Sequence, residues 1–381
     1  MKSFSQSCRL LFVFMLAISF FPAATWADNS QGLAIAIEAQ ERHTEVLMNL
    51  PGVVGTAVSL AEDGTPLVKI YTEKLGIGGL PKQLDGVPVV IEVTGRIHAL
   101  AAPPCKGPNA GDPGCPGSGG GDGIDPKTKF PLPVPIGVSA GNMASIQPSG
   151  LFVTCTTGTL GARVKNDSGQ VFALSNNHIF ALSNDGGVDD TAMIGDAIVQ
   201  PGPADADPVC SQSATSYNSI GILADYKPIN FTSGAINTID AAIAAVSIEQ
   251  VDRTTPTDGY LIPKSAHFEC VPNCSTLLNE PVQKYGRTTG LTKGTITGIN
   301  VTINVSYNKG TAMFTDQIEV SVDGKKGGFI KGGDSGSLLV TDPGKQPVGL
   351  LFAGDRRGKI GFANRIDLVL EHFSIVIDGE E

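Results

Sequence analysis

A glycine-rich hexapeptide near the C-terminal end carries the strongest chemical signal in the sequence. Residues 332–337 are Gly-Gly-Asp-Ser-Gly-Ser, and they lie between two runs of β-forming residues. A serine nucleophile needs backbone N–H groups turned toward the oxyanion that develops during acyl transfer, and glycines give the backbone the freedom for such a turn. We therefore expect Ser335 to be a nucleophile. The alternative interpretation is a glycine-rich tight turn without chemistry.

The second signal is a histidine placed just past a β-run. His178 ends the sequence Ala-Leu-Ser-Asn-Asn-His, and a serine hydroxyl is a weak nucleophile until such a base accepts its proton. A structural hydrogen-bond donor is the alternative interpretation of this residue. The remaining histidines lie in the N-terminal part, among cysteines, or near the C-terminus: His43, His98, His267 and His372.

The third group must be a carboxylate that orients the imidazole and stabilises its positive charge. Asp240 lies between the histidine and the serine in the sequence and precedes the uncharged run Ala-Ala-Ile-Ala, which must be buried. By propensity that run is also compatible with a helix capped by Asp240, so a structural role stays open. Asp225 and Asp196 are the reserve candidates.

These motifs together resemble those of a known enzyme family. The order His, Asp, Ser, with the serine in Gly-Asp-Ser-Gly, resembles the trypsin-like (chymotrypsin-fold) serine proteases, whose Thr-Ala-Ala-His is similar to Ser-Asn-Asn-His here. Residues 136–381 also resemble a narrower group, the Nal-type (narrow-leaf-like) proteases of plants and their bacterial relatives. The matching stretches are Gly158–Val164, Leu174–His178, Gly195–Asp196, Gln200–Gly202, Ile239–Ile243, Gly286–Gly290, Gly333–Ser337 and Val348–Gly354.

The resemblance implies an all-β fold of two six-stranded antiparallel β-barrels with the triad His178, Asp240 and Ser335 in the cleft between them. It also implies an oxyanion hole formed by the backbone N–H groups of Gly333 and Ser335. The family's specificity determinant lies six residues before the serine, which is Phe329 here, so a preference for Arg or Lys is not supported. The sequence departs from the family pattern at 203–207, where Pro-Ala-Asp-Ala-Asp replaces a glycine-rich continuation.

Composition divides the chain after residue 27 into three parts. Residues 28–100 combine an amphipathic helix, ended by Pro51, with β-runs at 53–60, 67–71 and 87–93, which predicts a small α+β module with a pro- or regulatory role. Residues 101–135 are rich in Pro, Gly and Asp and predict a linker. Residues 136–381 are mostly short β-runs, closed by an amphipathic helix near 366–373. The module therefore looks like a detachable unit.

The first 27 residues have the pattern of a secretory signal peptide. Lys2 and Arg9 precede an apolar run from 10 to 21 and a small-residue exit around Ala27, which predicts export to the periplasm or outside the cell. Removal of this segment lowers the formal net charge of −10 by two more units. An acidic surface argues against nucleic acid or an anionic membrane as partner, and the oligomeric state stays open.

Cysteine usage agrees with an oxidising compartment. Cys8 leaves with the signal peptide, and proximity in the sequence favours pairing of Cys105 with Cys115 and of Cys270 with Cys274. Cys155 and Cys210 are then left for each other, although other connectivities and metal ligation stay open. Neither close pair has the further ligands of a four-ligand zinc site, and no metal or organic cofactor is expected.

The sequence thus favours an exported serine endopeptidase that hydrolyses peptide or protein substrates. Two alternatives remain. A non-catalytic binding protein that keeps the protease fold is the first. The second is a serine esterase of the α/β-hydrolase class that would use Ser335 with His372 and either Asp355 or Asp367, although Ser337 occupies a position where that motif has glycine.

Overall fold

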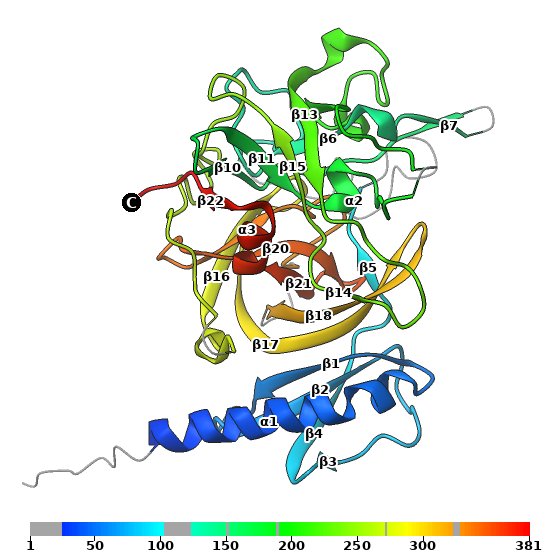
Figure 1. The fold of residues 1–381 in the computed structure, drawn as a ribbon, viewed down its shortest axis with the longest axis vertical. Coiled ribbons are helices and arrows are strands. Elements are labelled where there is room, and N and C mark those ends of the chain that lie inside the picture. Colours follow the sequence, from blue (N-terminus) through cyan, green and yellow to red (C-terminus); the bar gives the residue numbers. More distant parts are fainter. Residues whose placement is uncertain (1–24, 103–122, 150–151, 188–189, 271–272, 323–327) are drawn as a thin grey trace, which may run out of the picture.

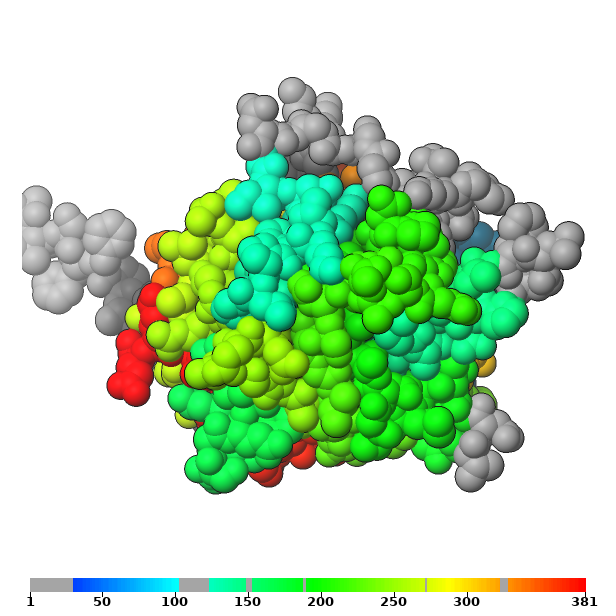
Figure 2. Space-filling view, turned by 90° about the horizontal axis from the view of Figure 1, so that it is seen from above, coloured from blue at the N-terminus to red at the C-terminus, as the bar shows by residue number. Residues whose placement is uncertain are grey.

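The structure is a computed structural model that describes residues 25–102, 123–149, 152–187, 190–270, 273–322 and 328–381. Three layers follow one another along its longest axis (Figure 1). One β-barrel lies at the upper end, a second barrel lies in the middle, and the N-terminal module lies at the lower end. Seen from the upper end, the surface is formed mainly by residues of the first barrel (Figure 2).

The first barrel is a closed ring of six antiparallel strands. The bent segment formed by β9 and β10 pairs with β6 at one end and with β11 at the other, and the ring continues through β15, β13 and β12 back to β6. The short strand β22 (Ile375–Ile377) extends the sheet beside β10. The ring strands are β6 (Ser139–Asn142), β9 (Gly158–Thr159), β10 (Ala162–Asn166), β11 (Val171–Ser175), β12 (Ala197–Gln200), β13 (Asn218–Tyr226) and β15 (Ala242–Ala245).

The second barrel closes in the same way. Its order is β16, β17, β18, β21, β20, β19 and back to β16, and every pair is antiparallel. The strands are β16 (Pro281–Gly286), β17 (Gly290–Tyr307), β18 (Gly310–Ser321), β19 (Leu338–Thr341), β20 (Pro347–Gly354) and β21 (Ile360–Arg365). The short strand β14 (Ile236–Asn237) adds to β18, and helix α3 (Ile366–Phe373) follows β21. Two six-stranded barrels with a C-terminal helix confirm the predicted fold class.

The N-terminal module packs helix α1 (Thr25–Met48) on a sheet of four strands. These strands are β1 (Val53–Leu60), β2 (Pro66–Thr72), β3 (Gln83–Leu84) and β4 (Val87–Val93), close to the β-runs predicted from the sequence. β1 also pairs antiparallel with β17, in the register Gly55 opposite Ile303 and Val58 opposite Ile299. The module is therefore not a separate unit connected only by a linker, because its sheet continues into the second barrel.

Two segments differ from the sequence-based expectation. The run after Asp240, which was compatible with a helix, is the buried strand β15, because β11 and β13 pair with its two edges. The end of the expected linker belongs to the first barrel, since Val134 is fully buried and its N–H donates to the Gln250 carbonyl. The domain boundaries 28–100, 101–135 and 136–381 remain predictions.

The structure contains two of the three expected disulfides, Cys155–Cys210 and Cys270–Cys274. Cys8, Cys105, Cys115 and residues 1–24 of the predicted signal peptide 1–27 lie outside the described residues. No helix in the described part of the chain is long and apolar enough to cross a membrane.

Candidate active site

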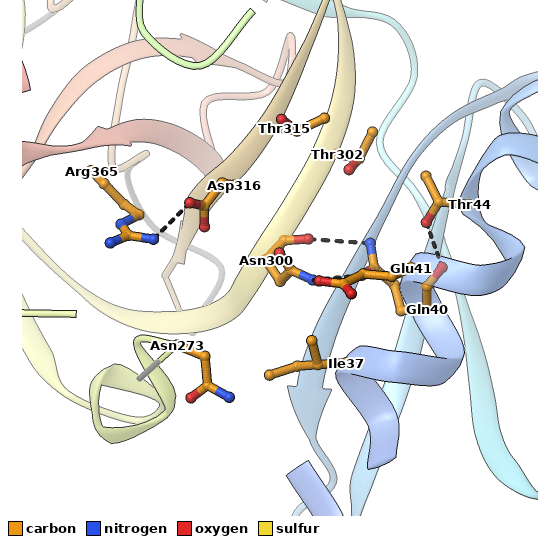
Figure 3. Close-up of a pocket in the computed structure, with 10 residues that line it drawn as sticks. All are labelled: Ile37, Gln40, Glu41, Thr44, Asn273, Asn300, Thr302, Thr315, Asp316 and Arg365. Atoms are coloured by element: carbon orange, nitrogen blue, oxygen red, sulfur yellow. Dashed lines mark hydrogen bonds and ion pairs between the residues drawn. The ribbon is translucent and has the colours of Figure 1, made fainter. Parts of the chain in front are cut away.

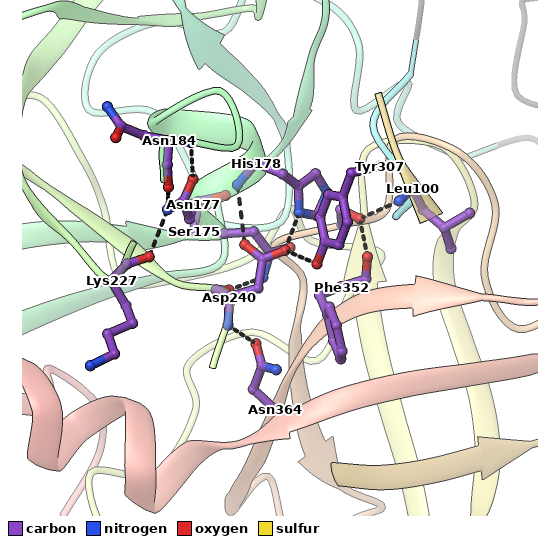
Figure 4. A network of polar contacts seen from close by, with 12 residues as sticks. Leu100, Ser175, Asn177, His178, Asn184, Lys227, Asp240, Tyr307, Phe352 and Asn364 are labelled. Carbon is purple, nitrogen blue, oxygen red and sulfur yellow. Dashed lines mark hydrogen bonds and ion pairs between the residues drawn. The ribbon is translucent and has the colours of Figure 1, made fainter. Parts of the chain in front are cut away.

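His178 lies in the first barrel, on the short helix α2 (Asn177–Phe180) that follows β11. Its backbone N–H donates to Asp240 Oδ1 at 3.1 Å, and its Nδ1 lies 2.6 Å from Asp240 Oδ2 (Figure 4). The side chain of Asn176 donates to the Asp240 carbonyl at 2.7 Å, which ties the two segments together. The Nε2 atom of His178 is buried and has no hydrogen-bond partner among the described residues. The ring is therefore held at one nitrogen and left open at the other.

Asp240 is completely buried and is fixed by groups from the second barrel as well. Its backbone N–H donates to Asn364 Oδ1 at 3.0 Å, and the Tyr307 hydroxyl donates to its Oδ2 at 2.8 Å. Burial, followed by the negative charge of Asp240, raises the pKa of Tyr307 well above its usual value. Tyr307 therefore stays protonated and acts as a hydrogen-bond donor to the carboxylate. The result is a carboxylate that is satisfied at both oxygens in a buried site.

Ser335 lies in the loop before β19 and is also buried. Its hydroxyl donates to the Phe352 carbonyl at 3.0 Å and accepts from the Leu100 N–H at 3.2 Å. Gly333 and Gly336 have φ values of +97° and +94°, a region that favours glycine, and side chains at either position would collide with neighbours. These two glycines let the loop present Ser335 and the Gly333 N–H toward the same cleft.

Asp334 fixes the loop that carries Ser335 through its buried side chain. It forms a fully buried ion pair with Lys284 of β16, with Nζ and Oδ2 3.4 Å apart. Its Oδ1 accepts from the Thr288 N–H at 2.9 Å, and its Oδ2 accepts from the Lys331 N–H at 2.9 Å and from the Thr289 hydroxyl at 2.8 Å. Burial lowers the pKa of Lys284, and the Asp334 charge opposes that effect. The loop conformation thus rests on groups inside the second barrel.

A second buried ion pair explains the departure at residues 203–207. Asp205, at the end of the short 3₁₀ helix Pro203–Asp205, pairs with the guanidinium of Arg287, with Arg287 Nε 2.7 Å from Asp205 Oδ2. The Arg287 N–H donates to the Thr159 hydroxyl at 3.0 Å, and that hydroxyl donates to the Gly333 carbonyl at 2.8 Å. The loop at 203–207 therefore links the first barrel to Arg287, which follows strand β16 of the second barrel, and through Thr159 to Gly333.

Phe329 lies inside the apolar core of the second barrel and is fully buried. It shares a hydrophobic cluster with Ile330 and Leu351, and Leu100 packs against that cluster. A Cβ atom on Gly361 would lie 3.3 Å from both Phe329 and Ile330, so this glycine leaves space beside their side chains. The surroundings of Phe329 are apolar, in keeping with the absence of an acid at this position.

The predicted residues are thus brought together to different degrees. His178 and Asp240 are in direct contact, whereas the Ser335 hydroxyl bonds to Phe352 and Leu100, and within the described ranges His178 Nε2 has no hydrogen-bond partner. The reserve Asp225 is exposed and accepts from the adjacent Tyr226 N–H, and Asp196 accepts from Asn142 and Met193.

The esterase arrangement finds no support in the geometry of its members. Asp355 pairs with Arg357, Asp367 pairs with Arg365, and His372 stacks edge-on against Phe373 on α3. Within the described ranges, no cluster of three or more His, Cys, Asp or Glu side chains is arranged to hold a metal ion.

Sequence reasoning missed Tyr307, Lys284 and Leu100. Tyr307 ends β17 next to a hairpin turn. Lys284 lies in β16, where the order of polar and apolar residues does not indicate that the lysine side chain is buried. Their roles depend on contacts with residues far away in the sequence, so local patterns carry no signal for them. Leu100 was assigned to the end of the module and not to the cleft.

The structure also has a pocket of about 470 Å³ away from this cleft (Figure 3). It lies between α1 and the second barrel, where the Asn300 side chain donates to Gln40 at 2.8 Å and to Glu41 at 3.1 Å. The ion pair between Arg365 and Asp316 lines its other side. Its described lining residues do not include His178, Asp240 or Ser335.

Comparisons with known proteins found matches of low sequence identity or partial coverage. A family model described as the Nal1 C-terminal domain matches residues 249–378, about a third of the chain, and no curated protein sequence matches. Among solved structures, Thermobifida fusca protease A is 18% identical with a TM-score of 0.38, and covers 65% of this chain and 100% of its own. Nocardiopsis protease is 18% identical with a TM-score of 0.37, at 58% and 92% coverage. Human heparin binding protein is 14% identical with a TM-score of 0.34, at 67% and 94% coverage.

Proposed function

We propose that this protein is an exported serine endopeptidase that acts through His178, Asp240 and Ser335. In this proposal Ser335 attacks a peptide carbonyl, His178 Nε2 accepts the proton and returns it to the leaving amine, and Asp240 orients the imidazole. The N–H groups of Gly333 and Ser335 stabilise the oxyanion. Export is proposed on the signal-like N-terminus of the sequence together with the two disulfides.

One observation carries the proposal. The Gly333 N–H lies 2.5 Å from the carbonyl oxygen of Leu100, and the Ser335 hydroxyl lies beside the same residue, at 3.2 Å from its nitrogen. This contact supports the proposal, because an oxyanion hole binds a peptide carbonyl through such N–H groups, and a buried His–Asp pair lies in the same region of the molecule. A tight glycine turn without chemistry has no need of this combination.

The test is labelling of the purified full chain by a fluorophosphonate probe, followed over time together with hydrolysis of an unstructured protein such as casein. We expect slow labelling of the wild-type protein, because residues 97–102 cover the serine, and loss of both activities in Ser335→Ala and His178→Ala. Ser168→Ala is the matched control, since Ser168 is exposed in the turn after β10.

Two results would decide against the proposal. Undiminished casein hydrolysis by a folded Ser335→Ala protein would remove Ser335 from the mechanism. Absence of labelling and hydrolysis in the wild type, and also in a Leu100→Asp variant whose charged side chain should displace residues 97–102, would favour a non-catalytic binding protein with a protease fold.

A further inference from the structure

Residues 97–102 run from the second barrel to the first, as the short strand β5 (Ile97–Ala99) followed by an isolated β-bridge at Ala102. On one side, β5 pairs antiparallel with β20, with His98 opposite Gly354 and Ala99 opposite Ala353. On the other side, Ala102 and Thr157 exchange two backbone hydrogen bonds, at 2.9 and 3.1 Å. Since Thr157 precedes β9 of the first barrel and β20 belongs to the second, the segment is anchored on both walls of the cleft.

Between these anchors, the backbone of Leu100 faces the proposed catalytic groups. Its N–H lies 3.3 Å from the Phe352 carbonyl and 3.2 Å from Ser335 Oγ, while its carbonyl accepts from the Gly333 N–H. The carbonyl carbon of Leu100 is therefore the one next to the nucleophile and the oxyanion hole. Figure 4 shows Leu100 and Phe352 close to the side chains of Tyr307 and His178.

The side chain of Leu100 fills an apolar recess. It packs against the cluster that contains Phe329 and Ile330. A Cβ atom on Gly354 would lie 3.0 Å from the Leu100 Cδ1 and 3.1 Å from Ile330, so glycine is needed there for the leucine to enter. A charged side chain at this half-buried position would lie among apolar neighbours, which is unfavourable.

We propose that the enzyme cleaves its own chain between Leu100 and Ala101, and that a leucine followed by small residues is the type of sequence it cuts in other proteins. This proposal rests on the proposed function. It names the bond and the substrate class, which the triad alone does not.

The reaction is balanced within the chain and one water molecule. Ser335 Oγ must first turn from its bonds with Phe352 and Leu100 toward His178 Nε2. It then forms a bond with the Leu100 carbonyl carbon, its proton passes to His178, and the bond to the Ala101 nitrogen breaks as that nitrogen takes the proton. Water hydrolyses the ester, leaving a Leu100 carboxylate, an Ala101 amine and a free Ser335 hydroxyl.

The first experiment follows the purified full chain over time by intact mass and N-terminal sequencing. We expect a fragment that begins at Ala101, no such fragment from Ser335→Ala, and a loss of at least about tenfold in cleavage rate for Leu100→Asp, which places a charge in the apolar recess. Leu100→Met is the matched variant that keeps an apolar side chain of similar volume, and it should still be cut.

The second experiment measures the substrate preference without relying on folding of any variant. Fluorogenic peptides with the sequence Ile-His-Ala-Leu, and with Lys or Asp in place of Leu, are offered to the wild-type enzyme. We expect the leucine peptide to be cleaved at least about tenfold faster than either charged peptide.

Failure of this proposal differs from failure of the proposed function. If the probe labels Ser335 and casein is hydrolysed while the chain stays intact between Leu100 and Ala101, self-cleavage is wrong and the segment is an inhibitor only. If the charged peptides are cut as fast as the leucine peptide, the substrate class is wrong. If Ser335 is never labelled in the wild type or in Leu100→Asp, the proposed function itself fails.

Discussion

At the scale of single residues, the surroundings of Asp240 determine what the imidazole can do. The carboxylate accepts from the backbone and ring of His178 and from the Tyr307 hydroxyl, and the adjacent N–H is fixed by Asn364. These bonds hold the ring with Nδ1 toward the carboxylate and Nε2 free for the serine proton. The side chains of His178, Tyr307 and Asn364 can each be replaced separately, which makes their roles testable one at a time.

Asp240→Asn should lower the hydrolysis rate by a factor on the order of 10⁴, because an amide in this position favours the wrong imidazole tautomer. The measurement is kcat on the leucine peptide, with circular dichroism to show that the fold is kept. Asp225→Asn, at the exposed reserve candidate, is the matched control and should stay close to wild type. A near-neutral Asp240→Asn would show that another acid has this role.

Tyr307→Phe should lower kcat by roughly tenfold while KM stays nearly constant, since a hydrogen bond to a charged group contributes about 1.5–3 kcal/mol. Tyr307 donates its hydrogen bond to Asp240, so its loss should act on kcat through the carboxylate. Tyr226→Phe on β13 is the control. A change confined to KM or to thermal stability would assign Tyr307 a structural role only.

The sequence was sufficient to select His178, Asp240 and Ser335 as candidates, because each lies at a strand end in a recognisable motif, and the structure places the first two in contact. Their supporting residues could not be predicted. Tyr307 and Lys284 act across barrels or strands, and only the folded chain brings them to Asp240 and Asp334.

At the scale of elements, the loop that carries Ser335 depends on a lysine in a neighbouring strand. Lys284→Met should destabilise the protein by about 3–5 kcal/mol, because it leaves the buried Asp334 carboxylate without its cation. Lys293→Met is the matched control, since the ion pair of Lys293 with Asp342 is largely exposed. Urea unfolding of both variants measures the difference, and equal loss in the two would contradict a special role for Lys284.

The barrel strands β10, β11, β17, β18, β19 and β20 were predictable from their β-runs, and the closing helix from its apolar positions, because these patterns are local. The run after Asp240 was ambiguous, since alanine and isoleucine suit both helix and strand, and pairing on both edges decides for β15. The course of residues 97–102 was not predictable. Their docking depends on backbone hydrogen bonds, which leave no mark in side-chain patterns.

At the scale of the whole molecule, the module and the second barrel share a core and a buried charge. Val58, Val68 and Ile70 pack in one cluster with Ile296 and Val320 of the barrel. Glu319 of β18 is fully buried, and its partners are module residues: Lys69 at 2.9 Å and the Tyr71 hydroxyl at 2.6 Å. These contacts support a role for the module in folding.

A chain that begins at residue 123 should therefore accumulate mostly as insoluble protein, because its apolar face and Glu319 lose their partners. Expression of residues 25–100 in the same cells as a separate chain should restore soluble protein. The measurement is the soluble yield of each form behind the same signal peptide. Equal yields of the short and full chains would rule out the folding role.

Five of the six tyrosines are held protonated by their surroundings, which makes the molecule sensitive to alkali. Burial is the first cause of the raised pKa of each, namely Tyr71, Tyr217, Tyr260, Tyr285 and Tyr307. In the unfolded chain a tyrosine ionises near pH 10, so the unfolded state loses protons that the native state keeps. Stability should be fully present below about pH 10 and fall as the pH rises further. Urea midpoints from about pH 9 to about pH 11 measure this, and an unchanged midpoint would contradict it.

The strand that joins the module to the cleft is part of the same chain as the serine that it covers, and this decides the kinetics of maturation. Because the Leu100 carbonyl is already docked at the Gly333 N–H, its effective concentration at the nucleophile is independent of how much protein is present. Processing should therefore be first-order and unaffected by dilution. If the proposal holds, foreign peptides compete with a tethered strand, so hydrolysis of added peptides should rise only after that strand has been cut and released.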